Sequence, residues 1–273
     1  GSHAQVADEV EVFAHFRELL VDAVRLRMRS DVPVGSCLSG GLDSSAIVCI
    51  ARQLLGQDAD YHPFPGRFLG TAADEWAYAS QVVEATGVHS HVVEPTVDGF
   101  MGELPAFVWY NELPVGSSSQ YAQWNVFRLA SQHGVTVLLD GQGADETLGG
   151  YEQYFARYVE ALQEGGDSAR LARELPAIRE RYPLALTPPA RALRDRLPFR
   201  VRHALSNHLG MGTNLLYGLR PGLAVQVARE AALSRLPGFN PLTNALAQDT
   251  FGRFLTTLLR SGDRNSMANS PER

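Results

Sequence analysis

The feature that most constrains this chain is a glycine-rich turn between a strand-like segment and a helix-like one. Residues 32–38 are mostly apolar, residues 39–44 read Ser-Gly-Gly-Leu-Asp-Ser, and the run 45–51 is largely apolar again. Paired glycines let backbone N–H groups converge at low steric cost, and the dipole of a following helix favours an anion there. The sequence therefore predicts a phosphate-binding turn at the end of a strand.

This turn differs from the nucleotide-binding loop that ends in Gly-Lys-Ser or Gly-Lys-Thr. That loop uses its lysine to reach the β- and γ-phosphates, whereas all 24 basic residues of this chain are arginine. The hydroxyls of Ser39 and Ser44 can donate to phosphate oxygens, and the Asp43 carboxylate suits a magnesium ion on pyrophosphate. We interpret the turn as a binding site for the pyrophosphate of a nucleotide, which departs as the leaving group.

Two further segments carry chemistry. Residues 135–139 are apolar or β-branched throughout, which is typical of a buried parallel strand, and residues 140–146 read Asp-Gly-Gln-Gly-Ala-Asp-Glu. Glycines at a strand end allow close approach to a nucleotide, while carboxylates can face magnesium. A third segment, residues 263–268, reads Asp-Arg-Asn-Ser-Met-Ala.

In this order, the three segments resemble the signatures of the synthetase domain of the asparagine synthetase family, and the first is similar to the PP-loop of ATP pyrophosphatases. The resemblance covers nearly the whole chain. It implies an ATP-dependent carbon–nitrogen ligase that forms an acyl-adenylate, releases pyrophosphate and AMP, and uses ATP and Mg2+. The implied ligands are Ser39, Gly40, Gly41, Asp43 and Ser44 for phosphates, Leu38, Phe68 and Gly141 for adenosine, and Asp43 and Asp145 for Mg2+.

Gln142 stands where some members of that family have a glutamate, and a neutral amide cannot accept a proton near pH 7. The base would then be Glu146, another group, or a group absent from these 273 residues. Glu146 is the candidate for proton transfer, with Gln142 and Asp145 beside it in the catalytic loop. The family also uses a downstream lysine, which is absent from these 273 residues. We accordingly expect the chain to be incomplete as a catalyst.

The acid and the amine that would be joined stay open. The expected substrates are a small-molecule or peptide carboxylate, with residues 112–120 as its candidate pocket, and an amine. The ammonia of asparagine synthetases comes from a glutaminase domain that starts with a cysteine, and Cys37 is the earliest cysteine here. Such a domain would be a partner, or the chain would close an internal amide as lasso-peptide macrolactam cyclases and β-lactam synthetases do. The remaining alternatives are a tRNA-modifying PP-loop enzyme and a non-catalytic adenine-nucleotide-binding module.

Composition excludes other classes. The chain is 45% hydrophobic and 20% charged, as globular domains are, and its formal net charge of −6 argues against a nucleic-acid partner. No apolar run reaches the ~20 residues of a membrane helix. Cys37 and Cys49 are expected to be buried and unpaired, as in a reducing cytoplasm. His89 and His91 alternate and would share a strand face, where solvated histidines are commoner than a metal site.

Alternating strands and helices predict an α/β fold, in which a parallel sheet is flanked by helices and followed by a mostly helical second half. The resemblance makes this fold adenine nucleotide α-hydrolase-like. We expect a nucleotide-binding core over residues 4–160 and a helical subdomain, truncated at its C-terminal end, over residues 161–273. The expected strands are 32–38, 62–68, 88–93 and 135–139, and the expected helices of the core are 8–29, 43–55, 74–86, 97–110 and 118–133.

Overall fold

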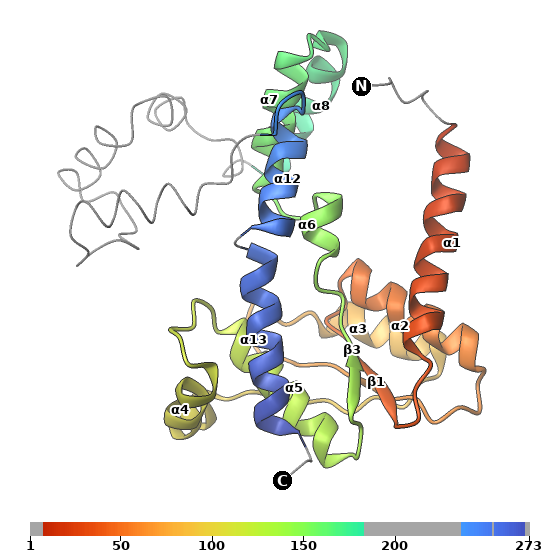
Figure 1. Ribbon diagram of the computed structural model, residues 1–273, viewed down its shortest axis with the longest axis vertical. Coiled ribbons are helices and arrows are strands. Elements are labelled where there is room, and N and C mark those ends of the chain that lie inside the picture. Colours follow the sequence, from red (N-terminus) through yellow and green to blue (C-terminus); the bar gives the residue numbers. More distant parts are fainter. Residues whose placement is uncertain (1–7, 183–235, 253, 271–273) are drawn as a thin grey trace, which may run out of the picture. The chain divides into compact units, whose positions relative to one another are not determined.

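A computed structural model describes residues 8–182, 236–252 and 254–270 (Figure 1). The chain divides into two compact units. The first comprises Gly1–Gln142 and Leu258–Arg273, and the second comprises Gly143–Thr257.

The first unit is built on a parallel sheet of three strands, β1 (Val34–Cys37), β2 (Pro63–Phe64) and β3 (Val137–Leu139). Their order is β2-β1-β3, so β1 lies in the centre, and Ser36 is level with both Pro63 and Leu139. This confirms the parallel α/β core. The strand expected over residues 88–93 is reduced to a single bridge between Gly66 and Val93.

The reason lies in the prolines of the neighbouring segment. His91 N donates to Pro63 O at 3.1 Å and Val93 N donates to Pro65 O at 3.0 Å, so residues 91–93 do lie alongside β2. Pro63 and Pro65 have no N–H with which to complete the ladder. A regular fourth strand therefore cannot form there.

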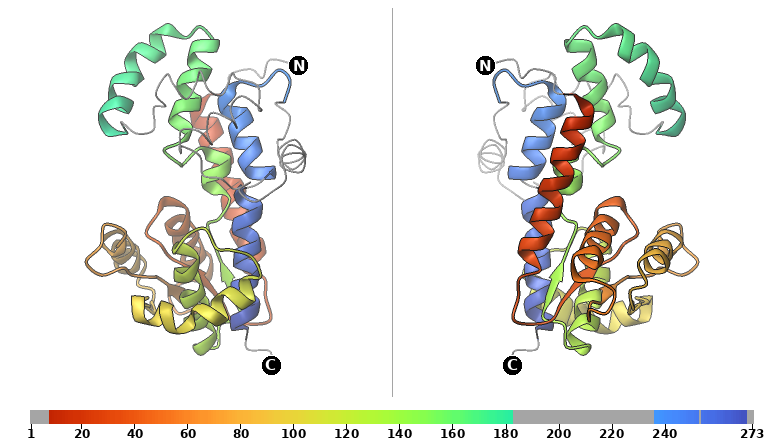
Figure 2. Two further views of the ribbon diagram at one scale, coloured as in Figure 1. Left: turned by 90° about the vertical axis from the view of Figure 1, so that its left-hand side faces the viewer. Right: turned by 90° about the vertical axis from the view of Figure 1, so that its right-hand side faces the viewer.

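Helices flank the sheet of this unit on both faces (Figures 1 and 2). Their bounds follow the predictions closely: α1 (Glu9–Arg27), α2 (Leu42–Leu55), α3 (Trp76–Thr86), α4 (Val97–Asn111) and α5 (Ser119–Gln132). One core joins the sheet to α1, α2 and α3 through Val24, Leu38, Val48, Tyr61 and Ala79. The other joins it to α5 through Phe64, Val126, Ala130 and Val135. Because neighbouring strand residues point to opposite faces, Leu139 packs in the first core and Leu138 in the second.

The two cysteines are free, as expected, but only one is withdrawn from solvent. Cys37 is partly buried against the α5 core, and burial raises the pKa of its thiol. Cys49 is exposed, which corrects the expectation that both are buried. Its neighbour Val48 faces the core in its place.

The second unit is helical in its described residues. It contains α6 (Ala144–Leu148), α7 (Tyr154–Glu164), α8 (Ser168–Arg181), α12 (Pro241–Phe251) and the start of α13 (Phe254–Asn269). Both α6 and α7 pack against α12, and Tyr154 Oη donates to Asp249 Oδ2 at 2.8 Å. The second compact unit therefore begins at Gly143, and the domain boundary expected at residues 160–161 stays a prediction. Residues 183–235 of the expected helical subdomain lie outside the described residues.

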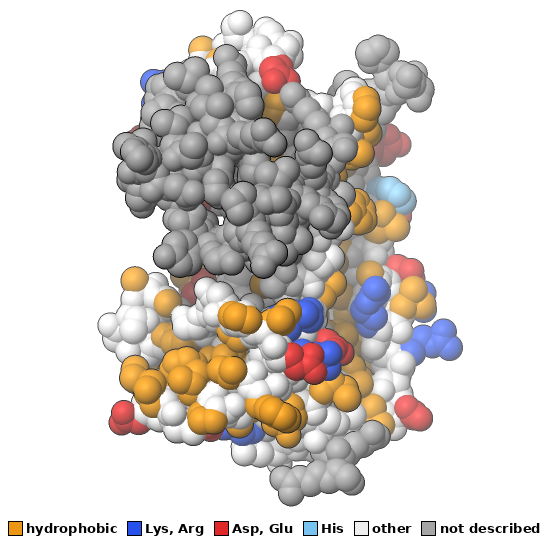
Figure 3. Space-filling view, turned by 60° about the vertical axis from the view of Figure 1, so that its left-hand side comes forward, with side chains coloured by type: hydrophobic (Ala, Val, Ile, Leu, Met, Phe, Trp, Pro, Cys, Tyr) orange, Lys and Arg blue, Asp and Glu red, His pale blue; other side chains and the backbone are white. Residues whose placement is uncertain are grey.

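Several large apolar side chains of the first unit reach solvent. On α4, Met101, Val108 and Trp109 are exposed, and hydrophobic side chains are visible on the surface drawn in Figure 3. Within the described ranges, no helix has the length and apolar character needed to cross a membrane.

Candidate functional site

The turn between β1 and α2 is held in shape by its own serines. Ser39 N donates to Ser44 Oγ at 3.2 Å, the two hydroxyl oxygens lie 2.9 Å apart, and Gly41 N donates to Ser39 Oγ at 3.2 Å. Gly41 is the N-cap of α2, and no side chain caps the helix. The first N–H groups of a helix have no intrahelical acceptor, so an anion can accept from them.

Only glycine fits at position 40 of this turn. Gly40 has a φ of +91°, and a Cβ there would lie 2.8 Å from Ala79 N and 2.9 Å from Glu75 O. The turn therefore packs directly on the backbone at the start of α3. This close packing fixes the direction in which the peptide groups of the turn point.

The second predicted loop lies against the first. A Cβ on Gly141 would lie 3.1 Å from Asp43 Cβ and 3.2 Å from Ser44 N, so the backbones approach as closely as a glycine permits. Gly141 follows β3 and Ser39 follows β1, which places both loops at the carboxyl ends of neighbouring parallel strands. Ligands of open parallel sheets bind at this edge.

The residues predicted to hold adenosine occupy the same edge. Leu38 follows β1, is 2% exposed, and donates its N–H to Phe64 O at 3.4 Å. Phe68 follows β2 and is partly buried. Leu38, Phe68 and Gly141 thus come after three adjacent strands of one unit, and their contact with adenosine stays a prediction.

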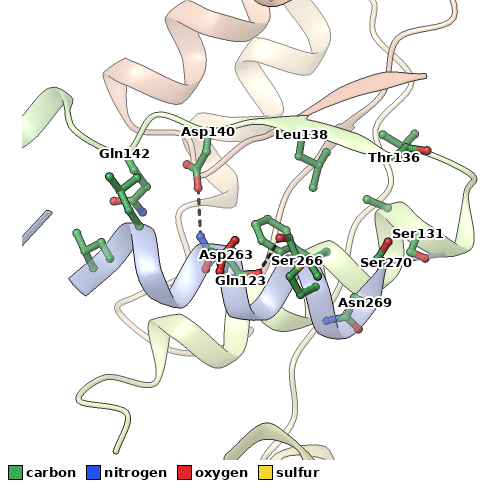
Figure 4. A pocket seen from close by; sticks show the side chains of 17 residues that line it. Gln123, Ser131, Thr136, Leu138, Asp140, Gln142, Asp263, Ser266, Asn269 and Ser270 are labelled. Carbon is green, nitrogen blue, oxygen red and sulfur yellow. Dashed lines mark hydrogen bonds between the residues drawn. The ribbon is translucent and has the colours of Figure 1, made fainter. Parts of the chain in front are cut away.

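A cavity of about 380 Å3 opens beside the end of β3 (Figure 4). Asp140 and Gln142 line it together with residues of α5 and of the part of α13 after Thr257. Desolvation of the carboxyl group by the surrounding protein atoms raises the pKa of Asp140. Hydrogen bonds from Gln123 and from the backbone of Gly141 and Gln142 oppose that rise. Gln123 was not identified from the sequence, because a single glutamine on an amphipathic helix carries no motif.

Asp145 and Glu146 belong to the second unit. Partial burial, and then the neighbouring charge of Glu146, raise the pKa of Asp145. Glu146 is only 1% exposed, and its Oε1 accepts a hydrogen bond from Tyr151 Oη at 2.8 Å. Burial and this carboxylate raise the pKa of Tyr151. Glu146 therefore has a structural partner in its own unit, and its part in proton transfer stays a prediction.

The carboxylates suit a magnesium–nucleotide complex better than a bare metal site. In the parts of the chain that the structure describes, no group of three or more His, Cys, Asp or Glu side chains is arranged to hold a metal ion. Magnesium, however, is commonly bound through one or two carboxylates, and substrate phosphates and water complete its coordination. Asp43, at the turn predicted to bind phosphate, fits that donor set.

The third predicted segment lies in α13 and is partly buried. Asn265 is 0% exposed and donates to Gln120 O at 3.0 Å, while Arg264 forms an ion pair with Glu112 at 3.0 Å. Glu112 begins residues 112–120, the stretch predicted to form the pocket for the substrate carboxylate. It has a left-handed conformation, with a φ of 61°. The segment thus anchors the start of that stretch, whose role in substrate binding stays a prediction.

The histidine pair of the sequence is part of a larger cluster in the first unit. The ring of His91 stacks on that of His133 at 3.6 Å and lies 4.9 Å from His62 and 4.8 Å from His89. Burial, and then the charges of His133, His62 and His89, lower the pKa of His91. Asp60 accepts from His62 at 2.6 Å, so one acid faces the cluster.

This histidine cluster predicts that the protein becomes less stable to unfolding as the pH falls. In the unfolded chain His91 titrates near its ordinary pKa of about 6.5; because its folded pKa is lower, the unfolded state binds more protons below that pH. The contribution of His91 is therefore complete above about pH 6.5 and is lost as the pH falls through the folded pKa. We expect the urea midpoint to fall between pH 7.5 and pH 5.5, and the fall to be smaller in His133→Gln. An equal fall in both proteins would contradict this reading.

Comparisons with known proteins show to which family the chain is similar. The family model described as asparagine synthase matches residues 15–273. Glutamine-hydrolyzing asparagine synthetase 1 of Bacillus subtilis is 37% identical over 153 residues, which cover 54% of this chain and 23% of that protein. A putative glutamine-hydrolyzing asparagine synthetase of Mycobacterium bovis is 29% identical over 258 residues, covering 93% of this chain and 39% of that protein. Amidase chry2 of Gibberella zeae is 29% identical over 160 residues, covering 54% of this chain and 24% of that protein. The chain spans less than half the length of these relatives.

Proposed function

The chain belongs to the asparagine synthase family, and on that premise we propose that it binds MgATP and joins a carboxylate to an amine through an acyl-adenylate. In the first step, a carboxylate oxygen bonds to the α-phosphorus while the bond to pyrophosphate breaks. In the second step, the amine nitrogen bonds to the carbonyl carbon while the carbon–oxygen bond to AMP breaks. The amine gives up a proton in this step.

The single observation that supports this proposal most is the approach of Gly141 to Asp43 and Ser44. It brings the acidic loop after β3 to the phosphate-binding turn after β1. The backbone N–H groups and hydroxyls of residues 39–44 would hold the pyrophosphate oxygens, and Asp43 would hold the magnesium ion. When bound, that ion neutralises charge on the phosphates.

Proton transfer is assigned to Glu146, because Gln142 lacks a basic group. The hydrogen bond from Tyr151 would orient the Glu146 carboxylate. Asp145 would be the second magnesium ligand. The amine is ammonia released by a glutaminase partner or the amino group of another substrate.

The test is the identity of the nucleotide products. We expect the chain, supplied with MgATP, aspartate as probe acid and ammonium as probe amine, to form AMP and pyrophosphate, slowly because it has no lysine. A missing electrostatic stabiliser commonly costs ~10²–10³ in rate. Chromatography that finds ADP as the main product would refute attack at the α-phosphate. Tight nucleotide binding without any turnover would favour the non-catalytic nucleotide-binding module.

A further inference from the structure

A series of hydrogen bonds between side-chain amides crosses the first unit and ends at Asp140. Asn111 Nδ2 donates to Asn265 Oδ1 at 3.1 Å, Asn265 Nδ2 donates to Gln123 Oε1 at 3.1 Å, and Gln123 Nε2 donates to Asp140 Oδ2 at 3.2 Å. Figure 4 shows the last of these bonds. This series of hydrogen bonds links α4 to the third sequence segment in α13, that segment to α5, and α5 to the end of β3.

The orientation of each amide in this series of hydrogen bonds is fixed by the final acceptor, Asp140. An ionised carboxylate only accepts hydrogen bonds, whereas an amide has one donating end and one accepting end. Asp140 therefore turns the Nε2 of Gln123 toward itself, which leaves Oε1 for Asn265. Asn265 and Asn111 are both 0% exposed, so water does not compete for the bond between them, whereas the bond from Gln123 to Asp140 lies at the exposed end of the series. Turning Gln123 over would place its oxygen against Asp140 Oδ2 and its NH2 group against the NH2 group of Asn265, so both hydrogen bonds would be lost.

We propose that Gln123 is a positioning residue of the nucleotide site, which couples the third segment to the Asp140–Gln142 turn. By holding the Asp140 side chain, it keeps the adjacent Gly141 against Asp43 and Ser44. Gln123 belongs to none of the three motifs, yet it joins the second to the third. The proposal rests on the proposed function in one respect, namely that this turn contacts a nucleotide.

The first measurement needs no nucleotide. The hydrogen bond from Gln123 lowers the pKa of Asp140, so Gln123→Leu should raise it, as followed by carbon-13 NMR of the Asp140 carboxyl group in the whole chain. Gln132→Leu is the matched control, because Gln132 is an exposed glutamine on the same helix. It should leave the Asp140 titration unchanged. An unaltered Asp140 pKa in Gln123→Leu would overturn the proposal.

The second measurement is nucleotide affinity by calorimetry, with AMP and with MgATP. We expect Gln123→Leu to bind both about 3- to 10-fold more weakly than the unchanged chain, the range expected for one lost hydrogen bond, and Gln132→Leu to bind them equally well. A shifted Asp140 pKa with unchanged affinity would overturn the coupling. If the unchanged chain binds neither nucleotide, the proposed function and the positioning role both fail, while the Asp140 titration still shows whether the hydrogen bond exists.

A third variant separates positioning from simple packing. In Gln123→Glu, a protonated carboxyl can donate to Asp140, whereas an ionised one repels it. Relative to the unchanged chain at each pH, affinity should be lowest near pH 8 and should rise as the pH falls toward the ordinary pKa of a glutamate, about 4.3. A loss that does not change with pH would show that only packing was disturbed, and would overturn the positioning role.

Discussion

Replacing Gly40 by alanine should weaken adenine-nucleotide binding by at least about tenfold, or roughly 1.4 kcal/mol. The φ of +91° is unfavourable for any residue with a Cβ, and that Cβ would meet backbone atoms of Ala79 and Glu75 at under 3 Å. Strain of this kind costs about 1–3 kcal/mol, and it can be relieved only if the phosphate-binding turn moves away from α3. Calorimetric titration with AMP and MgATP measures the loss.

Two glycine variants control this result. In Gly41→Ala the new Cβ would meet only the Ser39 hydroxyl, at 3.3 Å, and the φ of −66° suits alanine, so a much smaller loss is expected. Gly56→Ala introduces strain at a φ of +84° where no atom lies within 4 Å of the new Cβ. It should lower stability while nucleotide affinity is retained. If Gly40→Ala binds nucleotide as well as Gly41→Ala does, the turn is not the phosphate site.

The second large effect should come from Asp43→Asn, and it should be selective. If the carboxylate acts on magnesium and pyrophosphate, its neutralisation weakens MgATP binding by about tenfold or more, while AMP without magnesium is affected little. The substitution keeps the size of the side chain, so Gly141 can still pack against Asp43 Cβ. Titrations of both ligands, with and without magnesium, give the ratio of the two losses.

Asp58→Asn is a suitable control for the change in net charge, since Asp58 is an exposed acid of the same unit. It should change neither affinity. Equal losses of MgATP and AMP in Asp43→Asn would show that Asp43 supports the shape of the turn and does not hold the metal.

The fold and the meeting of the first two motifs were predictable because both depend on local chemistry. Apolar runs with glycine at their ends predict buried strands followed by tight turns, and parallel strands place those turns at one edge. The contact of Gly141 with Asp43 and Ser44 shows that the two loops do lie side by side. Which atoms touch adenosine or magnesium depends on a ligand, and those assignments remain predictions.

What could not be predicted depends on long-range partners. Gln123 gains its role only because Asn265 and Asp140, far away in the sequence, lie on either side of it. The strand expected over residues 88–93 failed because Pro63 and Pro65, in another segment, lack the N–H groups that it needed. Likewise, the burial of Glu146 depends on its surroundings in the folded unit, which a motif does not specify.

The central place of β1 has a consequence for how the protein acquires its site. Val34 pairs with Val137, so the loops that follow β1 and β3 meet only after the whole intervening chain has closed into a large loop. Closing such a loop costs entropy before its contacts form, and folds dominated by distant pairings assemble slowly. The proposed nucleotide binding would thus be a late event in folding, and a nascent chain that ends before β3 contains the complete Ser-Gly-Gly-Leu-Asp-Ser turn without the loop that lies against it.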